Sequence, residues 1–267
     1  MEIIGYLGAL LVGLTLGMFG AGGSILTLPV LVYLFGIDTS LATAYSLFIV
    51  GATALAGAIP NMRRGTISYR TAIIFSIPSL TAVYLTRAYL MPAIPETLFS
   101  VNDTVITKDI ALLIFFALIM IFAAISMIRH RKIPDHSHDP DSAFNYLMIL
   151  AEGSIVGVVT GLVGAGGGFL IIPALVLFAR LPMKMAVGTS LLIIAIKSLL
   201  GFVGDIQSGQ PIDWPFMLIF TGVTIVGIFI GSALGRVFDA QKQKGAFGWF
   251  VFIMGVIILI EELILGL

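Results

Sequence analysis

Apolar segments, separated only by short breaks of Pro, Gly or charged residues, occupy almost the whole chain. A helix that crosses a bilayer needs about 20 mostly apolar residues, so the chain has room for about eight to ten such segments and little else. Hydrophobic residues make up 59% of the 267 residues and charged residues 10%, whereas soluble domains carry about 25% charged residues. The pattern predicts a helical membrane protein and excludes a soluble globular fold.

Two apolar segments, residues 25–35 and 169–179, are too short to cross a hydrocarbon core of about 30 Å at about 1.5 Å per residue. Each follows a glycine cluster, and the clusters belong to an internal repeat with an offset of about 144 residues, which also pairs Pro29 with Pro173. The clusters are Gly20-Ala21-Gly22-Gly23-Ser24 and Gly164-Ala165-Gly166-Gly167-Gly168. The chain is therefore two copies of one unit.

Further motifs recur in both copies. A small residue followed closely by Ser-Leu occurs as Ala44-Tyr45-Ser46-Leu47 and as Gly188-Thr189-Ser190-Leu191, and Gly-x-x-Ile-Asp-Trp occupies residues 209–214. In these motifs and in the glycine-rich breaks, nearly the whole chain resembles the sulfite exporter TauE/SafE family of bacterial membrane transporters. The resemblance implies two four-segment halves and the export or uptake of a small sulfur-containing anion.

Charge placement tests how the chain crosses the membrane, because Lys and Arg in short loops concentrate on the cytoplasmic side. If each glycine break were only a kink, about six of these cations would oppose about seven. If each break turns the chain back, about eleven share one side and only Arg87 and Lys108 oppose them. The cations on the shared side are Arg63, Arg64, Arg70, Arg129, Arg131, Lys132, Arg180, Lys184, Arg236, Lys242 and Lys244. We therefore predict hairpins at both breaks, with both termini and the loop 91–109 outside.

Each half then has an odd number of full crossings, so the two copies must have opposite orientations. The predicted fold is an all-α polytopic membrane protein with two inverted repeats, each a re-entrant helical hairpin followed by three transmembrane helices. The first repeat covers residues 1–132, with the hairpin at 3–36 and helices at 39–62, 67–91 and 108–130. A cytoplasmic linker, 133–143, leads to the second repeat, 144–267, with the hairpin at 144–180 and helices at 183–205, 212–238 and 245–266.

The hairpin tips are the first candidate substrate site. Non-helical backbone at membrane depth is tolerated only where it is buried in protein or lines a water-filled cavity. The start of each outgoing helix, near Ser24 or Gly168, presents amide donors and the positive end of its dipole, which bind anions. We therefore expect both glycine clusters to contact substrate. The alternative is that the glycines only allow tight helix packing.

Polar side chains inside the apolar segments extend this site. Lys197 lies within an apolar helix and has three candidate roles: anion binding, proton carriage, or snorkelling of its stem toward the outer interface. Ser46, Thr189 and Ser190 offer hydroxyl donors to a sulfonate or sulfite oxygen, although such hydroxyls also bond back to their own helix. Inverted symmetry would bring the two hydroxyl motifs to opposite sides of one cavity.

Two further charged residues are candidates for coupling or gating. Glu152 lies within the apolar run 144–163 and is either a proton-coupling group or one half of an ion pair. Arg87 lies near the outer end of its helix and is either an interfacial anchor or a gate in the anion path. The chain has no cysteine, and the spacing of His130, His136 and His138 resembles no defined metal site, so we expect neither a metal nor a cofactor.

The resemblance implies a transporter in the bacterial cytoplasmic (inner) membrane that moves sulfite, sulfoacetate or a related organosulfonate. With the predicted inverted repeats, we expect it to be a secondary transporter that works by alternating access. An anion channel that uses the same site is the alternative. An enzyme is not expected, because the catalytic sequence motifs are absent. The expected partners are the anion, the lipid bilayer and either a proton or sodium as coupling ion. Both a monomer and a homodimer are compatible with the sequence. The formal net charge of zero gives no reason to expect binding of nucleic acid.

Overall fold

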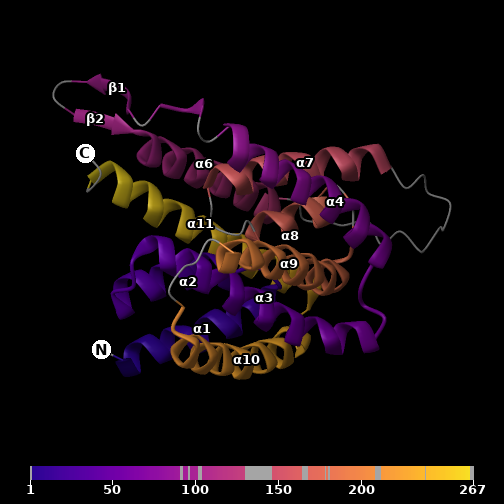
Figure 1. The fold of residues 1–267 in the computed structure, drawn as a ribbon. Helices are drawn as coiled ribbons and strands as arrows, with labels where there is room; N and C mark the ends of the chain where they lie inside the picture. The colour runs from indigo at the N-terminus through magenta and orange to yellow at the C-terminus, as the bar shows by residue number, and fades with distance from the viewer. Residues whose placement is uncertain are drawn as a thin grey trace.

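The computed structural model describes residues 2–90, 93–95, 97–101, 104–129, 146–163, 168–177, 179, 181–207, 212–237 and 239–264. Helices make up nearly all of this part of the chain (Figure 1). In chain order, the elements of the first half are α1 (Glu2–Phe19), α2 (Gly23–Pro29), the π-helix η1 (Val30–Leu34), α3 (Thr39–Arg63), α4 (Tyr69–Leu85), the π-helix η2 (Thr86–Leu90), β1 (Thr97–Val101), β2 (Thr104–Thr107) and α6 (Lys108–Arg129). Those of the second half are α7 (Tyr146–Val163), α8 (Gly168–Leu177), α9 (Met183–Gln207), α10 (Trp214–Val237) and α11 (Ala240–Ile264).

The predicted all-α class needs one correction. Strands β1 and β2 form an antiparallel pair within the segment that we predicted as a loop. The residues that pair include Thr, Val, Ile and Phe, which favour strands, and Asn102 and Asp103 stand between the two strands, where turn-forming residues are expected. The predicted linker, 133–143, lies outside the described residues.

The chain turns back after α1. Gly20 adopts a positive φ of 80°, which glycine reaches without steric cost. Beyond this turn, Gly23 lies against the Val12 carbonyl, and Val30 lies against Gly8 nearer the start of α1. The segment formed by α2 and η1 therefore runs antiparallel to α1, as the sequence predicted for this break.

Each half of the chain packs a helix against the other half through glycines. Gly13 of α1 closely approaches the carbonyl oxygen of Thr224 in α10, and Gly157 of α7 approaches that of Ser79 in α4. Gly13 and Gly157 are equivalent in the sequence repeat. Ser79 and Thr224 are also equivalent, once the one residue inserted in the second copy is allowed for. The same contact is thus made twice, once on each side of the molecule (Figure 1).

Two pairs of equivalent helices pack antiparallel to each other. In α3 and α9, Gly51 lies against Leu199 and Gly57 against Leu191. In α6 and α11, Gly248 lies against Ile128, and Gly255 lies against Ile121. Equivalent helices therefore run in opposite directions where they meet.

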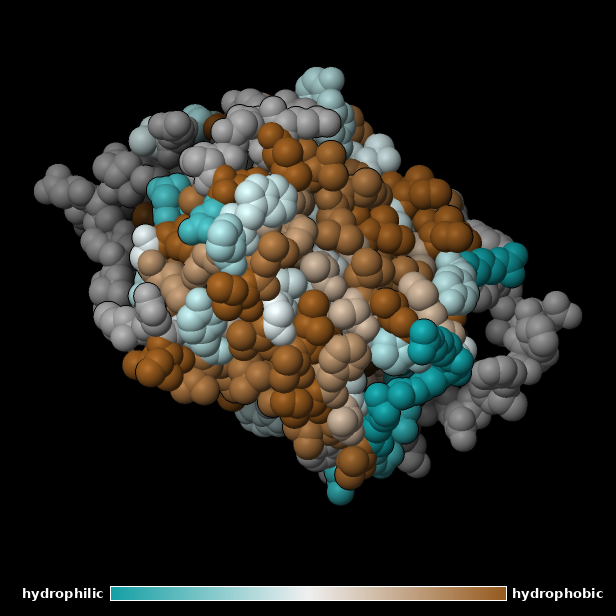
Figure 2. Space-filling model, turned by 60° about the horizontal axis from the view of Figure 1, so that its bottom comes forward, coloured by the Kyte–Doolittle hydropathy of each residue, from teal (hydrophilic) through white to brown (hydrophobic). Residues whose placement is uncertain are grey.

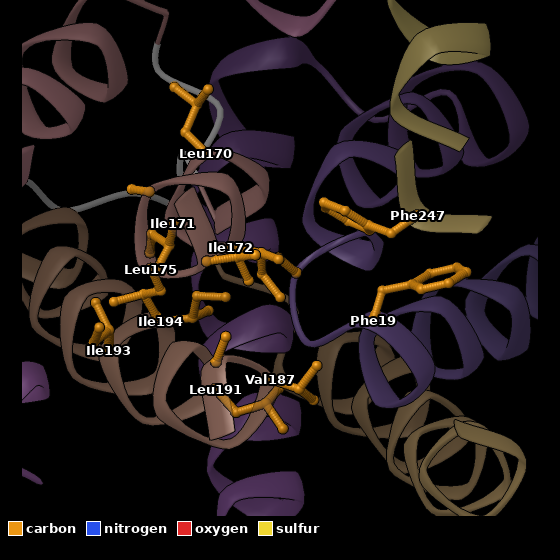
Figure 3. Packing of buried hydrophobic residues seen from close by; sticks show 14 of the residues in the cluster. Phe19, Leu170, Ile171, Ile172, Leu175, Val187, Leu191, Ile193, Ile194 and Phe247 are labelled. Atoms are coloured by element: carbon orange, nitrogen blue, oxygen red, sulfur yellow. The ribbon is translucent and has the colours of Figure 1, made fainter. Parts of the chain in front are cut away.

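The largest apolar core joins the central helices. Side chains of α8 and α9, among them Ile171, Ile172 and Ile194, point toward one another beside the turn that follows Phe19 (Figure 3). Phe247 of α11 approaches Phe19, with ring centroids 5.5 Å apart. This packing holds the turn after α1 close to the start of α9.

The outer surface fits a bilayer. Figure 2 shows a broad hydrophobic band with hydrophilic residues gathered toward its ends. Among the described residues, four helical stretches are long and apolar enough to cross a membrane: Leu41–Arg63, Met183–Val203, Trp214–Val237 and Lys242–Ile260. Shorter apolar helices occupy Ile3–Phe19, Gly23–Leu34, Ala117–Arg129 and Ile149–Thr160. The chain is therefore a multi-pass membrane protein.

Candidate functional site

The turn after α1 meets the second half of the chain at Ser190. The Ser190 hydroxyl lies 3.0 Å from the Gly20 carbonyl oxygen and 2.9 Å from that of Val187, and it donates to both. A Cβ at Gly20 would lie 2.7 Å from the Ser190 Oγ, so only glycine permits this approach. In this conformation the Ser190 hydroxyl therefore binds protein backbone and not a ligand.

The two predicted hairpin segments touch each other near their starts. The Ser24 hydroxyl, at the start of α2, donates to the Ala21 carbonyl oxygen at 2.8 Å. A Cβ at Gly168, the first residue of α8, would lie 2.8 Å from the same Ser24 hydroxyl. Residues from both glycine clusters thus come together at the centre, although Gly164, Ala165, Gly166 and Gly167 lie outside the described residues.

Neighbouring helices cover the rest of the first cluster. Ala21 is fully buried. A Cβ at Gly22 would lie 3.0 Å from the ring of Phe250 in α11, and Gly23 packs closely on the α1 backbone. The tip that we predicted to face a cavity is therefore packed against protein in this conformation.

The two Ser-Leu motifs make equivalent contacts between the halves. The Thr189 hydroxyl accepts a hydrogen bond of 3.0 Å from the Ser68 amide, just before α4. At the equivalent place, the Tyr45 hydroxyl accepts one of 2.6 Å from the Asp213 amide, just before α10. Ser46, which precedes Leu47 in the first motif, is half-buried. These residues tie α9 to α4 and α3 to α10.

A cavity of about 330 Å³ opens next to this central contact. Its lining residues come from α1, α3, α9, α10, α11 and the turn before α4: Gly17, Pro60, Asn61, Arg64, Thr66, Lys184, Val187, Ser232, Gly235, Arg236 and Gln243. Val187 also lies against Gly20, so the inner end of the cavity reaches the turn after α1. The cavity therefore leads to the contact between the two halves.

The charge of the cavity favours an anion. Arg64, Lys184 and Arg236 contribute three cations, whereas no carboxylate stands among the described residues that line the cavity. All three side chains are exposed, so water reaches their charged groups. Carboxylates, sulfonates and other oxyanions are the ligands that guanidinium and ammonium groups bind best.

Local backbone geometry places the polar groups of the cavity. Gly65, with a positive φ of 68°, turns the chain directly after Arg64. The Thr66 hydroxyl then donates to Asn61 Oδ1 at 3.0 Å, and the Asn61 amide donates to the Gly57 carbonyl oxygen at 2.8 Å. From the opposite side, the Gln243 amide donates to the Met18 carbonyl oxygen. These hydrogen bonds hold the polar side chains that line the cavity in place. A ligand therefore does not have to order them when it binds.

The charged candidates within the helices lie apart from the cavity lining. Lys197 in α9 is 8% exposed, and its Nζ is buried within the protein, which argues against snorkelling to the surface. Glu152 in α7 is 7% exposed. Arg87 belongs to η2, and its side chain lies outside the described residues. His130, His136 and His138 also lie outside them.

Residues 6–258 match the family described as Sulfite exporter TauE/SafE. The chain belongs to this family. The match spans nearly the whole chain and confirms the resemblance that the repeated motifs indicated. Together with the apolar helices, it identifies this TauE/SafE protein as a multi-pass membrane transporter.

Several relatives carry names consistent with that assignment. A "Probable membrane transporter protein" of Xylella fastidiosa (strain 9a5c) is 29% identical over 253 residues, which cover 93% of this chain and 91% of the relative. The "Probable membrane transporter protein YunE" of Bacillus subtilis (strain 168) is 25% identical, over 94% of this chain and 92% of its own. The "Probable membrane transporter protein MJ0441" of Methanocaldococcus jannaschii is 26% identical, over 97% and 94% respectively. No solved structure matches the chain.

Sequence reasoning did not find the cavity of this TauE/SafE chain. Arg64, Lys184 and Arg236 served only to orient the chain in the membrane, because they lie far apart in the sequence and at the ends of different helices. One sequence signal could have pointed to the cavity: all three cations were predicted on the same side of the membrane, and each lies next to a segment that packs at the centre of the molecule. Only the fold brings them around one space.

Proposed function

We propose that this TauE/SafE protein is a secondary transporter for a small sulfur-containing anion, such as sulfite, sulfoacetate or a related organosulfonate. The observation that carries the proposal is the cavity, which ends at a contact between the two halves and whose described lining holds three cations and no carboxylate. A cavity of about 330 Å³ has room for such an anion with part of its hydration shell. Family membership makes sulfite the first anion to test.

The arrangement of helices supports an inverted repeat. Equivalent helices α3 and α9 run antiparallel, as do α6 and α11, and the contacts of α1 with α10 recur between α7 and α4. Inverted repeats of secondary transporters bind substrate between the repeats and rock one repeat against the other. We therefore propose two inverted repeats, each with a re-entrant hairpin at its start, and alternating access between them.

The contact between Gly20 and Ser190 is the proposed inner end of the path in this conformation. Gly20 belongs to the first repeat and Ser190 to the second, so relative movement of the repeats separates them. The freed Ser190 hydroxyl and Gly20 backbone would then face the anion. In this scheme the anion first contacts the cations of the cavity. After the repeats move, it contacts the residues predicted at the hairpin tip.

We propose that the cavity opens to the cytoplasm. The N-terminal end of α1, the C-terminal end of α11 and the strands β1 and β2 lie toward one end of the molecule in Figure 1. Arg64, Lys184 and Arg236 belong to the group of cations that the charge bias assigns to the opposite, cytoplasmic side. Both termini would then be outside the inner membrane of a bacterium.

Counterflow in proteoliposomes tests this function. Vesicles preloaded with unlabelled sulfite should take up labelled sulfite transiently above its equilibrium level, and uptake should saturate with concentration. Sulfoacetate and sulfate in the same assay would define the accepted anions. Unsaturable flux without counterflow would instead assign a channel, and the absence of flux for every sulfur anion would refute the proposed substrate class.

A further inference from the structure

Glu152 is a buried acid that the proposed anion path does not use. It lies in α7 and is 7% exposed. Both carboxyl oxygens are buried and have no hydrogen-bond partner in the described part of the protein. A buried carboxylate without a partner is very costly, so the group must be neutral or must have a function that compensates this cost.

Two hydroxyls on the neighbouring helix share this property. Ser76 and Ser79 lie on α4, which packs against α7, and their Oγ atoms are also buried without a hydrogen-bond partner among the described residues. The two helices approach closely, since Gly153 lies against the Phe75 carbonyl and Gly157 against that of Ser79. The interface between α4 and α7 therefore holds several unsatisfied oxygen atoms, which is unusual for a protein interior.

The fold itself does not require these unsatisfied groups. The sequence repeat aligns Glu152 with Gly8, a residue without a side chain. It also aligns Ser79 with Thr224, whose hydroxyl is satisfied by Thr53 at 2.7 Å. The first copy thus builds the same helix contact with its polar groups paired, so the buried acid is specific to the second copy.

No described cation on the surrounding elements compensates a charge on Glu152. The elements that pack against α7 are α4, η2, α6 and α8. Their described titratable or charged side chains are all exposed at the surface: Tyr69, Arg70, Tyr84, Tyr89 and Arg129. Lys197, one of two buried lysines among the described residues, lies on α9, which packs against α4; the other, Lys244, lies on α11. The Glu152 carboxyl is therefore best accommodated here as the neutral, protonated acid.

We propose that Glu152 carries the proton that couples anion transport to the proton gradient. The proposal rests on the proposed transport function. The carboxylate takes up one proton from the water on one side, is buried as the neutral acid between α4 and α7, and releases that proton to the other side after the repeats move. Ser76 and Ser79 would donate hydrogen bonds to the charged form when the interface opens.

Glu152→Gln tests this role, because glutamine keeps the shape of the protonated acid and cannot release a proton. The variant should retain sulfite counterflow in proteoliposomes without a pH gradient. It should lose the accumulation of sulfite that an imposed pH gradient drives in the wild type. Ser154→Ala on the same helix, where the Ser154 hydroxyl bonds back to the Leu150 carbonyl oxygen, should behave as the wild type in both assays.

Several outcomes would overturn the proposal. Accumulation driven by the pH gradient in Glu152→Gln would exclude the residue as the proton carrier, and loss of counterflow in the folded variant would make it part of the anion path. If sulfite accumulation by the wild type follows a sodium gradient and not the pH gradient, the coupling ion is sodium and not the proton. If Glu152→Gln does not fold, Glu152→Asp is the deciding variant. It should retain proton-driven accumulation of sulfite, with the pH dependence of that accumulation shifted from the wild type. An unshifted pH dependence overturns the proposal. Absence of counterflow in the wild type would refute the transport function instead.

Discussion

Replacement of Arg64, Lys184 and Arg236 together by glutamine is expected to lower transport efficiency at least about a hundredfold, while the protein remains folded. A hydrogen bond between a charged group and its partner contributes about 1.5 to 3 kcal/mol, and about 1.4 kcal/mol corresponds to a tenfold change in affinity. Each single replacement should therefore weaken anion affinity about tenfold. Uptake rates against sulfite concentration in proteoliposomes provide the measurement.

Arg63→Gln is the matched control for this triple variant. Arg63 neighbours Arg64 in the sequence and is exposed, but it does not line the cavity. Its replacement changes the charge of the same helix end and should leave affinity unchanged. An equal loss in Arg63→Gln would mean that the general surface charge, and not the cavity, attracts the anion. Unchanged affinity in the triple variant would remove the cavity from the transport path.

Gly231→Val is expected to prevent stable folding. A Cβ at Gly231 in α10 would overlap the carbonyl oxygen of Leu14 in α1, and backbone cannot move aside as a side chain can. Overpacking a core usually costs about 1 to 3 kcal/mol, and here two helices would have to separate along their shared interface. The yield of monodisperse protein after detergent extraction and its unfolding temperature both report this effect.

Gly222→Val separates this steric effect from a change in helix propensity. Gly222 lies on the same helix, is exposed, and has nothing within 4 Å of the position that a Cβ would take. Both substitutions make the same chemical change, but only the one at position 231 enters the contact with α1. Similar losses in the two variants would contradict a close packing of α1 on α10.

The sequence predicted the turn after α1 because a glycine cluster interrupted a helix and preceded a segment too short to cross the membrane. Such local signals are readable, since a positive φ at Gly20 depends on the residue itself. The strands β1 and β2 escaped prediction, because an isolated pair of short strands within a loop has only a weak sequence signal.

The candidate site was harder to predict than the fold. Ser190 and Gly20 were both expected at the centre, but their hydrogen bond to each other could not be foreseen from either motif alone. Anion binding was one of three roles considered for Lys197, and this residue does not line the cavity. Burial and pairing depend on contacts between distant segments, and neither spacing nor composition encodes these contacts directly.

Cysteine accessibility tests most directly whether the cavity holds the transported anion and faces the cytoplasm. The chain has no native cysteine, so Ser232→Cys introduces a single thiol among the lining residues. An impermeant thiol reagent should modify it in inside-out vesicles, and saturating sulfite should slow the reaction. Asn102→Cys, between β1 and β2, should react only in right-side-out vesicles and without any effect of sulfite. Reaction of both cysteines from the same side, or an unchanged rate for Ser232→Cys in saturating sulfite, would contradict the account.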